Sequence, residues 1–185
     1  MTPAMASDSG HLLLMLRDLL DNGVLWWGLA ACGLAQLSKL FVELALHGQW
    51  RPAVLFETGG MPSSHSALMT GTAAGIGWNQ GFQDPLFALA ATLCFVVLYD
   101  ASGVRYAAGL TAARVNTLAG SNEITGSIWD KALKENLGHT KLEVLAGSIV
   151  GPLVALPGLA LVGTPLHLIA QLAHQFSPNL SAALG

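Results

Sequence analysis

A short polar segment ahead of an apolar run indicates phosphate chemistry. Residues 59–66 read Gly-Gly-Met-Pro-Ser-Ser-His-Ser, and no charged residue follows them before Asp84. Ser63 and Ser64 are candidate N-cap residues, and the N–H groups of a first helical turn lack partners within the helix and attract anions. His65 is therefore placed for phosphate chemistry. The alternative is that a serine only caps the helix and His65 is a polar residue at a membrane surface.

A second segment combines an imidazole with a carboxylate. Residues 137–147 read Leu-Gly-His-Thr-Lys-Leu-Glu-Val-Leu-Ala-Gly, so His139 and Glu143 are four residues apart. In a helical turn, Glu143 can hold one ring nitrogen of His139 and leave the other as a nucleophile or base. The alternative is a capping box, in which Thr140 is the N-cap and Glu143 bonds to the backbone. Glu143 can also serve both purposes.

Two further positions offer a cation to a phosphate. Residues 99–105 read Tyr-Asp-Ala-Ser-Gly-Val-Arg at the end of an apolar run. Arg105 can present a planar set of donors with Asp100 orienting it, or the two can form an ion pair without a function. Lys39 lies in the last turn of an earlier apolar run. It either points into a helix bundle as a phosphate ligand or extends to the lipid headgroups.

The composition is that of an integral membrane protein. Charged residues make up 10% of the chain, whereas soluble domains have about 25%. The hydrophobic fraction is 52% and the mean hydropathy is +0.54. A net charge of −3 without basic clusters gives no indication of nucleic-acid binding, so nucleic acid is not expected as a partner. Cys32 and Cys94 lie far apart in apolar runs, so neither a disulfide nor a metal site is expected.

The apolar runs predict an all-α fold, a polytopic membrane helical bundle with four to five transmembrane helices. It is expected to form a single domain over residues 1–185. The four expected spans are residues 24–46, 66–81, 85–99 and 144–163. Residues 1–22 are expected to form a short amphipathic N-terminal segment. A C-terminal segment, residues 164–185, carries an apolar helix to about residue 176 that is either a fifth span or an interfacial piece.

Crossings at these runs place the three motifs on one side of the membrane, because the loop 47–65 and the region 100–142 then share a side. Together with the adjacent end of the first span, these regions hold seven of the eight basic residues: Lys39, Arg51, Arg105, Arg114, Lys131, Lys134 and Lys141. Cytoplasmic loops are enriched in Lys and Arg, so the site is expected to face the cytoplasm. Close helix packing is expected at two Gly-x-x-x-Gly spacings, Gly71 with Gly75 and Gly147 with Gly151.

In their order along the chain, the three motifs resemble those of the divergent branch of the type-2 phosphatidic acid phosphatase superfamily. This branch is related to acid phosphatases and vanadium-dependent haloperoxidases. The resemblance covers residues 25–151 and rests on Gly-Gly-Met-Pro-Ser-Ser-His-Ser, Asp-Ala-Ser-Gly-Val-Arg and Gly-His-Thr-x-x-Glu-Val-x-x-Gly. It implies that His65 is a general acid and that His139, oriented by Glu143, forms a phosphohistidine. Ser64 and the backbone around it, supported by Ser63, would hold phosphate oxygens. Neither a metal nor another cofactor is implied.

The chain departs from the superfamily pattern in its cations. Lys39 and the Arg-Pro pair at Arg51 are separated by eleven residues, more than in the superfamily, so Lys39 is the expected phosphate ligand and Arg51 a weaker one. The superfamily's Ser-Arg pair before the third-motif histidine is missing, since residues 131–136 read Lys-Ala-Leu-Lys-Glu-Asn. The missing cation is expected to be Arg105, Lys134 or Lys131. Arg105 is preferred because it belongs to a motif of the divergent branch.

The resemblance implies a hydrolase, a metal-independent phosphomonoesterase acting on a membrane lipid or isoprenoid phosphate from the cytoplasmic side. Its partners would be the lipid phosphate substrate and the membrane lipids, and the oligomeric state stays open. The alternative is a catalytically degenerate protein that binds or transports phospholipid without hydrolysis, which the non-standard set of cations favours. A third hypothesis, haloperoxidase activity, requires a denser set of cations.

Overall fold

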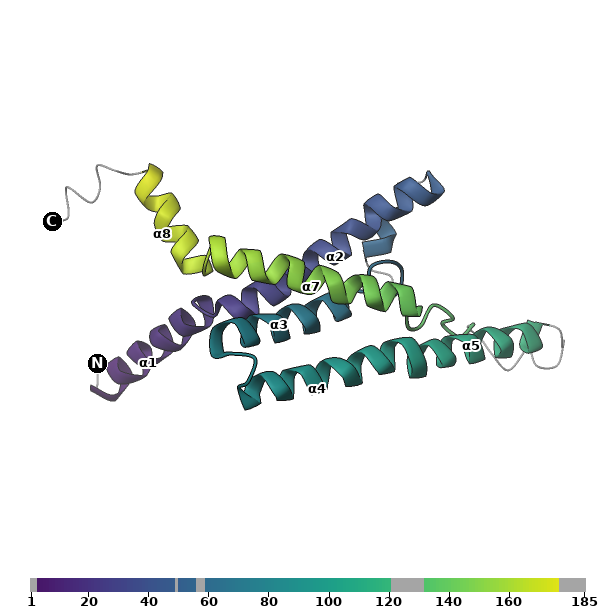
Figure 1. Ribbon diagram of the computed structural model, residues 1–185, viewed down its shortest axis with the longest axis horizontal. Helices are drawn as coiled ribbons and strands as arrows, with labels where there is room; N and C mark the ends of the chain where they lie inside the picture. The colour runs from purple at the N-terminus through teal and green to yellow at the C-terminus, as the bar shows by residue number, and fades with distance from the viewer. Residues whose placement is uncertain (1–2, 49, 56–58, 121–131, 177–185) are drawn as a thin grey trace.

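The computed structural model describes residues 3–48, 50–55, 59–120 and 132–176, and within these ranges all regular structure is helical (Figure 1). The α-helices are α1 (Pro3–Leu20), α2 (Gly23–His47), α3 (Ser64–Gln80), α4 (Pro85–Tyr99), α5 (Arg105–Gly120), α7 (Lys141–Leu161) and α8 (Pro165–Phe176). Two short elements join them, the 3-10 helix η1 (Pro52–Leu55) and the π-helical turn η2 (Asp100–Val104).

Among the described residues, three helical segments are long and apolar enough to cross a membrane: Gly23–Leu46, Pro85–Ala119 and Lys141–Leu161. They confirm a helical membrane bundle, while the number of crossings stays a prediction. The remaining expected span corresponds to α3, whose 17 residues cover about 25 Å. The 12 residues of α8 cover about 18 Å, well short of a hydrocarbon core of about 30 Å.

Helix α3 lies at the centre of the bundle. It packs against α2, α4 and α7, and α2 also packs against α7 (Figure 1). A Cβ atom added at Gly147 would lie 2.2 Å from the carbonyl oxygen of Ser63, and one at Gly151 would lie 2.2 Å from Thr70 Oγ1. These contacts confirm the close packing expected at this Gly-x-x-x-Gly pair. Small residues matter here because lipid tails are as apolar as leucine, so close van der Waals contact holds membrane helices together.

Side chains cap the starts of several of the described helices, where backbone N–H groups lack intrahelical partners. Asn22 caps α2, Ser63 caps α3, Asp84 caps α4 and Thr140 caps α7. Two of these caps, Ser63 and Thr140, belong to the motifs singled out in the sequence. The chemistry-bearing residues therefore stand at or just before the first turns of α3 and α7.

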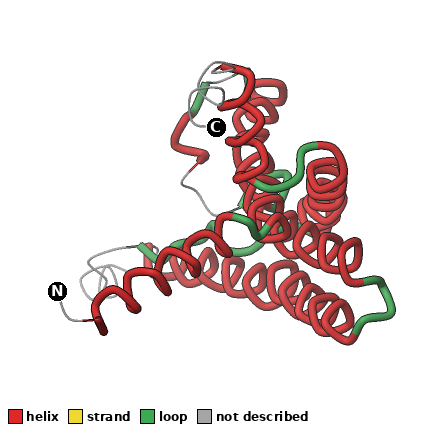
Figure 2. The backbone as a smooth tube through the Cα atoms, turned by 90° about the vertical axis from the view of Figure 1, so that its left-hand side faces the viewer, coloured by secondary structure: helices red, strands yellow, loops and turns green. Residues whose placement is uncertain are grey.

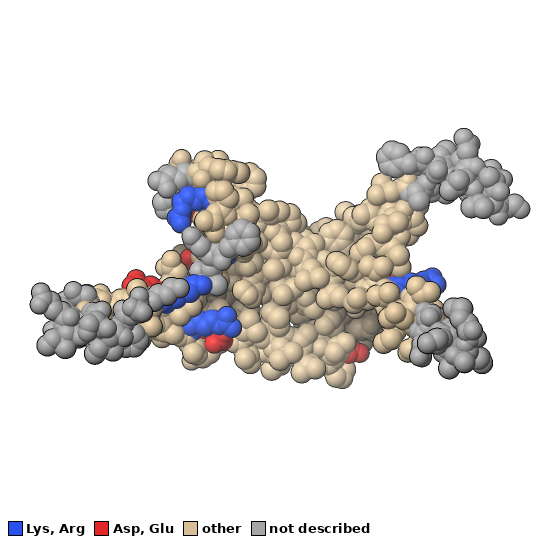
Figure 3. Space-filling view, turned by 180° about the vertical axis from the view of Figure 1, so that it is seen from behind, with Lys and Arg blue, Asp and Glu red and all other residues tan. Residues whose placement is uncertain are grey.

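The helical backbone does not end with α4 at Tyr99, where the apolar run was expected to leave the membrane. It continues through the π-helical turn η2 into α5, so that α4, η2 and α5 form one long rod (Figure 1). The helical segment Pro85–Ala119 has 35 residues and is about 52 Å long, which exceeds the hydrocarbon core by about 20 Å. The rod is therefore longer than a perpendicular crossing requires, and α5 lies at the end of the molecule where most visible Lys and Arg side chains gather (Figures 1 and 3).

Helices α1 and α8 lie at the opposite end of the molecule (Figure 1). Helix α1 projects away from the bundle (Figure 2), and its side chains from Leu12 to Leu16 are all exposed. A hydrogen bond of 2.7 Å from Thr164 Oγ1 to Asp21 Oδ1 connects the segments that lead into α2 and α8. The assignment of residues 1–22 as a short amphipathic segment stays a prediction, as does the choice between a fifth span and an interfacial piece for the apolar helix of residues 164–185. Residues 1–2 and 177–185 lie outside the described ranges.

Candidate active site

Five of the residues expected to bind or react with phosphate line one cavity of about 530 Å³. They come from four separate segments of the chain: α2, the first turn of α3, the start of α5 and the loop before α7. The five residues are Lys39, Ser64, His65, Arg105 and His139. The fold thus brings together all three motifs and the lysine of the first apolar run.

Glu143 performs both of the roles that its position in the sequence allows. Its carboxylate Oε2 lies 2.9 Å from His139 Nδ1 and accepts a hydrogen bond of 3.1 Å from the Thr140 backbone N–H. The Thr140 hydroxyl in turn accepts from the Glu143 N–H at 3.3 Å, which completes a capping box. A carboxylate at Nδ1 favours the tautomer with its proton on that nitrogen, so the lone pair of Nε2 is available for attack.

The π-helical turn fixes the backbone of His139. The His139 N–H donates to the Ala101 carbonyl at 2.9 Å, and the ring of His139 is buried. Gly138 before it has φ +77°, and a Cβ atom added there would lie 2.3 Å from the backbone nitrogen of Tyr106. Only glycine fits this conformation and this contact. Because π-helical turns widen the backbone spacing, carbonyl groups within them become available to outside donors, as Ala101 shows here.

The two serines of the first motif have different positions. The Ser63 side chain is fully buried, caps α3 by accepting from the Ser66 N–H at 3.3 Å, and accepts from the Ser66 hydroxyl at 2.9 Å. Its backbone N–H donates to the Glu143 carbonyl at 2.9 Å, which ties α3 to α7. Ser64 instead lines the cavity beside His65. Ser63 is thus placed as a supporting residue, and Ser64 is placed to contact an anion at the start of α3.

Lys39 points into the bundle and not toward the headgroups. Its side chain is 3% exposed, and its Nζ donates to the Gly59 carbonyl at 2.8 Å. An ammonium group has three donors, so one hydrogen bond to the backbone leaves donors for a ligand in the cavity. A buried charge is costly unless it is hydrogen-bonded or paired. The Glu143 carboxylate already acts on Lys39 as an opposite charge, and an anion bound in the cavity would add a second one.

Arg105 and Asp100 form an ion pair across the π-helical turn. Arg105 Nε lies 2.5 Å from Asp100 Oδ2, and the Arg105 side chain is 59% exposed. Guanidinium carries five N–H donors, so the bond through Nε orients the group and leaves its terminal nitrogens for a phosphate. The ion pair and the phosphate-binding interpretation are therefore compatible, since Arg105 also lines the cavity.

The surroundings of His65 lower its pKa below the ordinary value. The largest cause is burial, which disfavours the imidazolium ion, and positive charge on Arg105, His139 and Lys39 acts in the same direction. His65 lies in the first turn of α3, outside the three segments that are long enough to cross a membrane. A phosphate dianion among these cations would offset their charge and favour the protonated form of His65.

The remaining cations considered in the sequence are not part of this cavity. Lys134 is exposed and is not among the residues that line it, and Lys131 lies outside the described residues. Arg51 makes an ion pair of 3.2 Å with Glu43. Of the candidates for the missing cation, Arg105 alone among the described ones lines the cavity.

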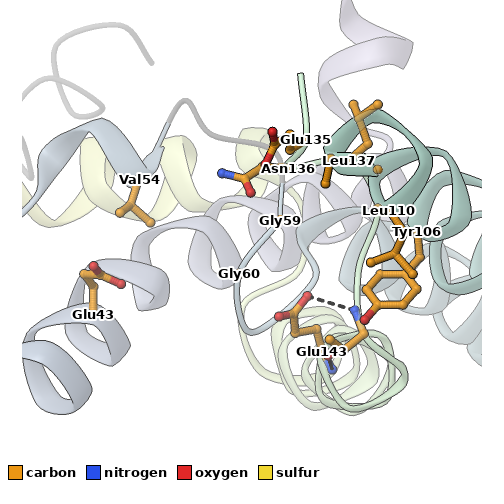
Figure 4. Close-up of a pocket in the computed structure, with 14 residues that line it drawn as sticks. Glu43, Val54, Gly59, Gly60, Tyr106, Leu110, Glu135, Asn136, Leu137 and Glu143 are labelled. Carbon is orange, nitrogen blue, oxygen red and sulfur yellow. Dashed lines mark hydrogen bonds between the residues drawn. The ribbon is translucent and has the colours of Figure 1, made fainter. Parts of the chain in front are cut away.

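A second cavity, of about 450 Å³, adjoins the first across Gly59 and Gly138, which line both. Figure 4 shows Glu43 and Val54 on one side of the Gly59–Gly60 turn and Tyr106 and Leu110 on the other. Carboxylates of Glu43, Glu135 and Glu143 line this second cavity. Their negative charge disfavours a phosphate here, so the first cavity is the candidate phosphate site.

Several residues that position the site were not recognised in the sequence. Gln36 donates from Nε2 to the Leu55 carbonyl at 2.6 Å and holds η1 against α2. Asn116 on α5 donates from Nδ2 to the Leu133 carbonyl at 2.8 Å and accepts from the Leu133 N–H at 2.9 Å. These bonds hold the loop before His139. Residues so far apart in the chain leave no local signal.

No three His, Cys, Asp or Glu side chains are grouped as a metal site within the described residues. The cavity's charged groups instead match an anion, because Lys39 and Arg105 supply positive charge and α3 supplies the N–H groups of its first turn.

Comparison with known proteins places the chain in a family. Residues 20–154 match the Divergent PAP2 family. A relative, the "Uncharacterized membrane protein YuiD" of Bacillus subtilis (strain 168), is 35% identical over 150 residues, which is 75% of this chain and 95% of the relative. No solved structure matches the chain significantly. Since the family match extends from the end of α1 into α7 and contains every residue of the candidate site, the chain belongs to the Divergent PAP2 family.

Proposed function

We propose that this chain is a metal-independent phosphomonoesterase that hydrolyses a membrane lipid or isoprenoid phosphate through a phosphohistidine intermediate. The cavity shared by Lys39, Ser64, His65, Arg105 and His139 carries the proposal. Membership of the Divergent PAP2 family supports a phosphatase-like function. A site among membrane helices suits a substrate whose tail stays in the bilayer.

Phosphoryl transfer requires positive groups at the phosphoryl oxygens, an in-line nucleophile and a proton for the leaving group. The side chains of the cavity can supply each of these. Lys39, Arg105 and the first turn of α3 would hold the oxygens. His139 Nε2 attacks phosphorus, the bond from phosphorus to the alkoxide breaks, and His65 gives its proton to the alkoxide. Water then attacks the phosphohistidine and passes a proton to His65. The lipid alcohol and inorganic phosphate leave, and both imidazoles regain their starting states.

The alternative, binding or transport of a phospholipid without hydrolysis, is favoured by the small number of cations. Lys39 and Arg105 are the two Lys or Arg side chains among the described residues that line the cavity. A cavity with two cations holds a phosphate less strongly than one with more, so turnover has to be measured.

The decisive experiment uses the purified full chain, a panel of radiolabelled lipid phosphates, and EDTA. We expect phosphate release by the wild-type protein and by Lys134→Ala, a matched control for loss of a cation outside the cavity. His139→Ala is expected to abolish release and to lose the acid-labile label of the phosphohistidine, and His65→Ala to slow its formation. Release that survives His139→Ala would exclude the phosphohistidine mechanism. Lipid binding without release by the wild type would support the alternative.

We also propose that the site faces the cytoplasm, because the end of the molecule that carries it also carries most of the visible basic residues (Figure 3). Such an orientation would suit a lipid phosphate of the cytoplasmic leaflet. Topology reporters inserted near residues 55 and 125 would report this side directly, and an external signal from either would refute the orientation.

A further inference from the structure

The candidate phosphate cavity has an apolar part that the hydrolysis itself does not use. Leu29, Cys32 and Gly33 of α2 line it together with Val97 of α4. Lys39 stands ten residues after Leu29 on the same helix, so the cavity wall extends along α2 for about 15 Å. That is about half the thickness of a bilayer's hydrocarbon core.

This apolar part lies where two helices leave a gap. Helices α2 and α4 both pack against α3, but they have almost no packing with each other, and α3 lies between them in Figure 1. Leu29 and Gly33 are exposed, whereas Cys32 is half-buried. The part of α2 that lines the cavity therefore has a half-buried side at Cys32 and an exposed side at Leu29 and Gly33. In a membrane, the open edge faces the lipid.

Along α2, Gln36 stands between the apolar residues of the cavity and Lys39. Gln36 donates to the Leu55 carbonyl at 2.6 Å, and both residues line the same cavity. A hydrocarbon chain attached to a phosphate beside Lys39 would therefore run along α2 past Gln36 toward Leu29 and the middle of the bilayer. Such a chain would remain in hydrocarbon along its whole length, which avoids the cost of exposing it to water.

Gly33 is unlike the close-packed glycines of the bundle. A Cβ atom added at Gly28 on the same helix would lie 2.3 Å from Thr72 Oγ1, whereas one added at Gly33 would have no atom within 4 Å. Glycine within a helix costs about 1 kcal/mol relative to alanine. Close contact between helices explains this cost at Gly28 but not at Gly33. What glycine provides at position 33 is empty space beside the cavity.

We propose that the groove between α2 and α4 holds the hydrocarbon tail of the substrate, which enters sideways from the bilayer, and that Gly33 determines how bulky a tail it admits. The groove is defined by Leu29, Cys32, Gly33 and Val97. Its continuity with the cations of the phosphate cavity identifies the occupant as the tail of an amphiphile with a phosphate head. This inference rests on the proposed function for the phosphate end only.

A binding experiment tests whether a lipid tail occupies the groove, and it does not require the protein to turn over a substrate. The chain has two cysteines, and Cys94, on α4, is not among the residues lining the cavity, so Cys94→Ser leaves Cys32 as the single thiol. This variant, in phosphatidylcholine vesicles, is treated with N-ethylmaleimide in the presence of hexadecylphosphonate or methylphosphonate. We expect hexadecylphosphonate to slow the labelling of Cys32 by about tenfold or more, since a filled groove excludes the reagent, and methylphosphonate to leave it unchanged. Equal labelling rates with both phosphonates would overturn the proposal.

A substitution tests the role of Gly33. Gly33→Leu adds bulk to the groove, and Leu34→Phe adds bulk to the neighbouring position, which is exposed and lines none of the cavities described here. We expect Gly33→Leu to lower kcat/KM for a long-chain lipid phosphate by about 10- to 100-fold, as expected for a misfit in an apolar pocket. Butyl phosphate hydrolysis and the Leu34→Phe variant should stay close to wild type.

The outcomes separate the groove from the proposed function. Equal loss by Gly33→Leu on both substrates, or no loss on the long-chain substrate, would overturn the role of Gly33. If the wild type hydrolyses neither substrate, the phosphatase proposal fails, and protection of Cys32 alone then decides whether the groove binds a lipid tail.

Discussion

Replacing Glu143 with glutamine separates the two roles of this side chain. In the structure, Glu143 Oε2 is bonded to His139 Nδ1 at 2.9 Å and to the Thr140 N–H at 3.1 Å. Glutamine also completes capping boxes, so Glu143→Gln should keep the start of α7 intact. It removes the negative charge that holds the imidazole. A loss of activity without a loss of stability is therefore expected.

The size of the loss follows from the hydrogen bond to His139. A hydrogen bond to a charged group contributes about 1.5–3 kcal/mol and a neutral one about 0.5–1.5 kcal/mol, so the lost charge costs about 1–1.5 kcal/mol. This corresponds to about tenfold in rate. If the glutamine NH₂ group faces Nδ1, the proton moves to Nε2 and the nucleophile is lost. The comparable Asp-to-Asn change in a serine protease triad costs about 10⁴-fold. The expected fall in kcat therefore lies between about 10- and 10⁴-fold.

The assay measures single-turnover hydrolysis of a radiolabelled lipid phosphate and the formation of the phosphohistidine. The thermal unfolding of each variant is measured separately. Thr140→Ala is the matched control, because it removes the bond of 3.3 Å from the Glu143 N–H to the Thr140 hydroxyl. It should cost about 1 kcal/mol of folding stability while kcat stays within about threefold. The reasoning is refuted if Glu143→Gln keeps kcat within about threefold of wild type, or if Thr140→Ala loses as much activity as Glu143→Gln.

Three further predictions concern the same cavity. Asp100→Asn weakens the bond that orients Arg105, so we expect KM for the lipid phosphate to rise about 3- to 10-fold with kcat less affected; an unchanged KM would contradict this role. The lowered pKa of His65 means that its acid form is lost at a pH below the ordinary histidine pKa, so kcat/KM should fall as pH rises through that lower value. The fall in kcat should lie at higher pH, because bound phosphate favours the protonated form of His65. His65→Gln should remove this limb, and a limb that persists in that variant belongs to another group. Gly138→Ala should lower Tm and activity together, since its Cβ would lie 2.3 Å from the Tyr106 nitrogen; a variant with wild-type Tm would disprove the contact.

Local patterns in the sequence were sufficient for much of the architecture. Thr140 and Glu143 formed the expected capping box, because a cap depends on residues three positions apart and on nothing distant. Gly147 and Gly151 lie in a close helix contact, as their spacing predicted, although only the structure shows that the partner is α3. The membrane bundle followed from apolar length alone. These features depend on near neighbours along the chain or on composition.

Other features were decided by contacts between distant segments. The continuation of α4 through a π-helical turn could not be read from the apolar run, which only marks where hydrocarbon contact ends. The choice among the candidate cations also required the fold, since Arg105 lines the cavity and Lys134 does not. These features depend on contacts between residues far apart in the chain. The hydrogen bond from the His139 N–H to the Ala101 carbonyl in the π-helical turn is one such contact.

By itself, the sequence determined the membrane class, the motifs and their order, because composition, helix caps and the Glu143 to His139 spacing are local properties. Tertiary structure decided that Lys39, His65, Arg105 and His139 share one cavity and that residues of both α2 and α4 line it. The physical reason is that a binding site depends on which backbones can approach one another, and here glycines at helix contacts set that approach.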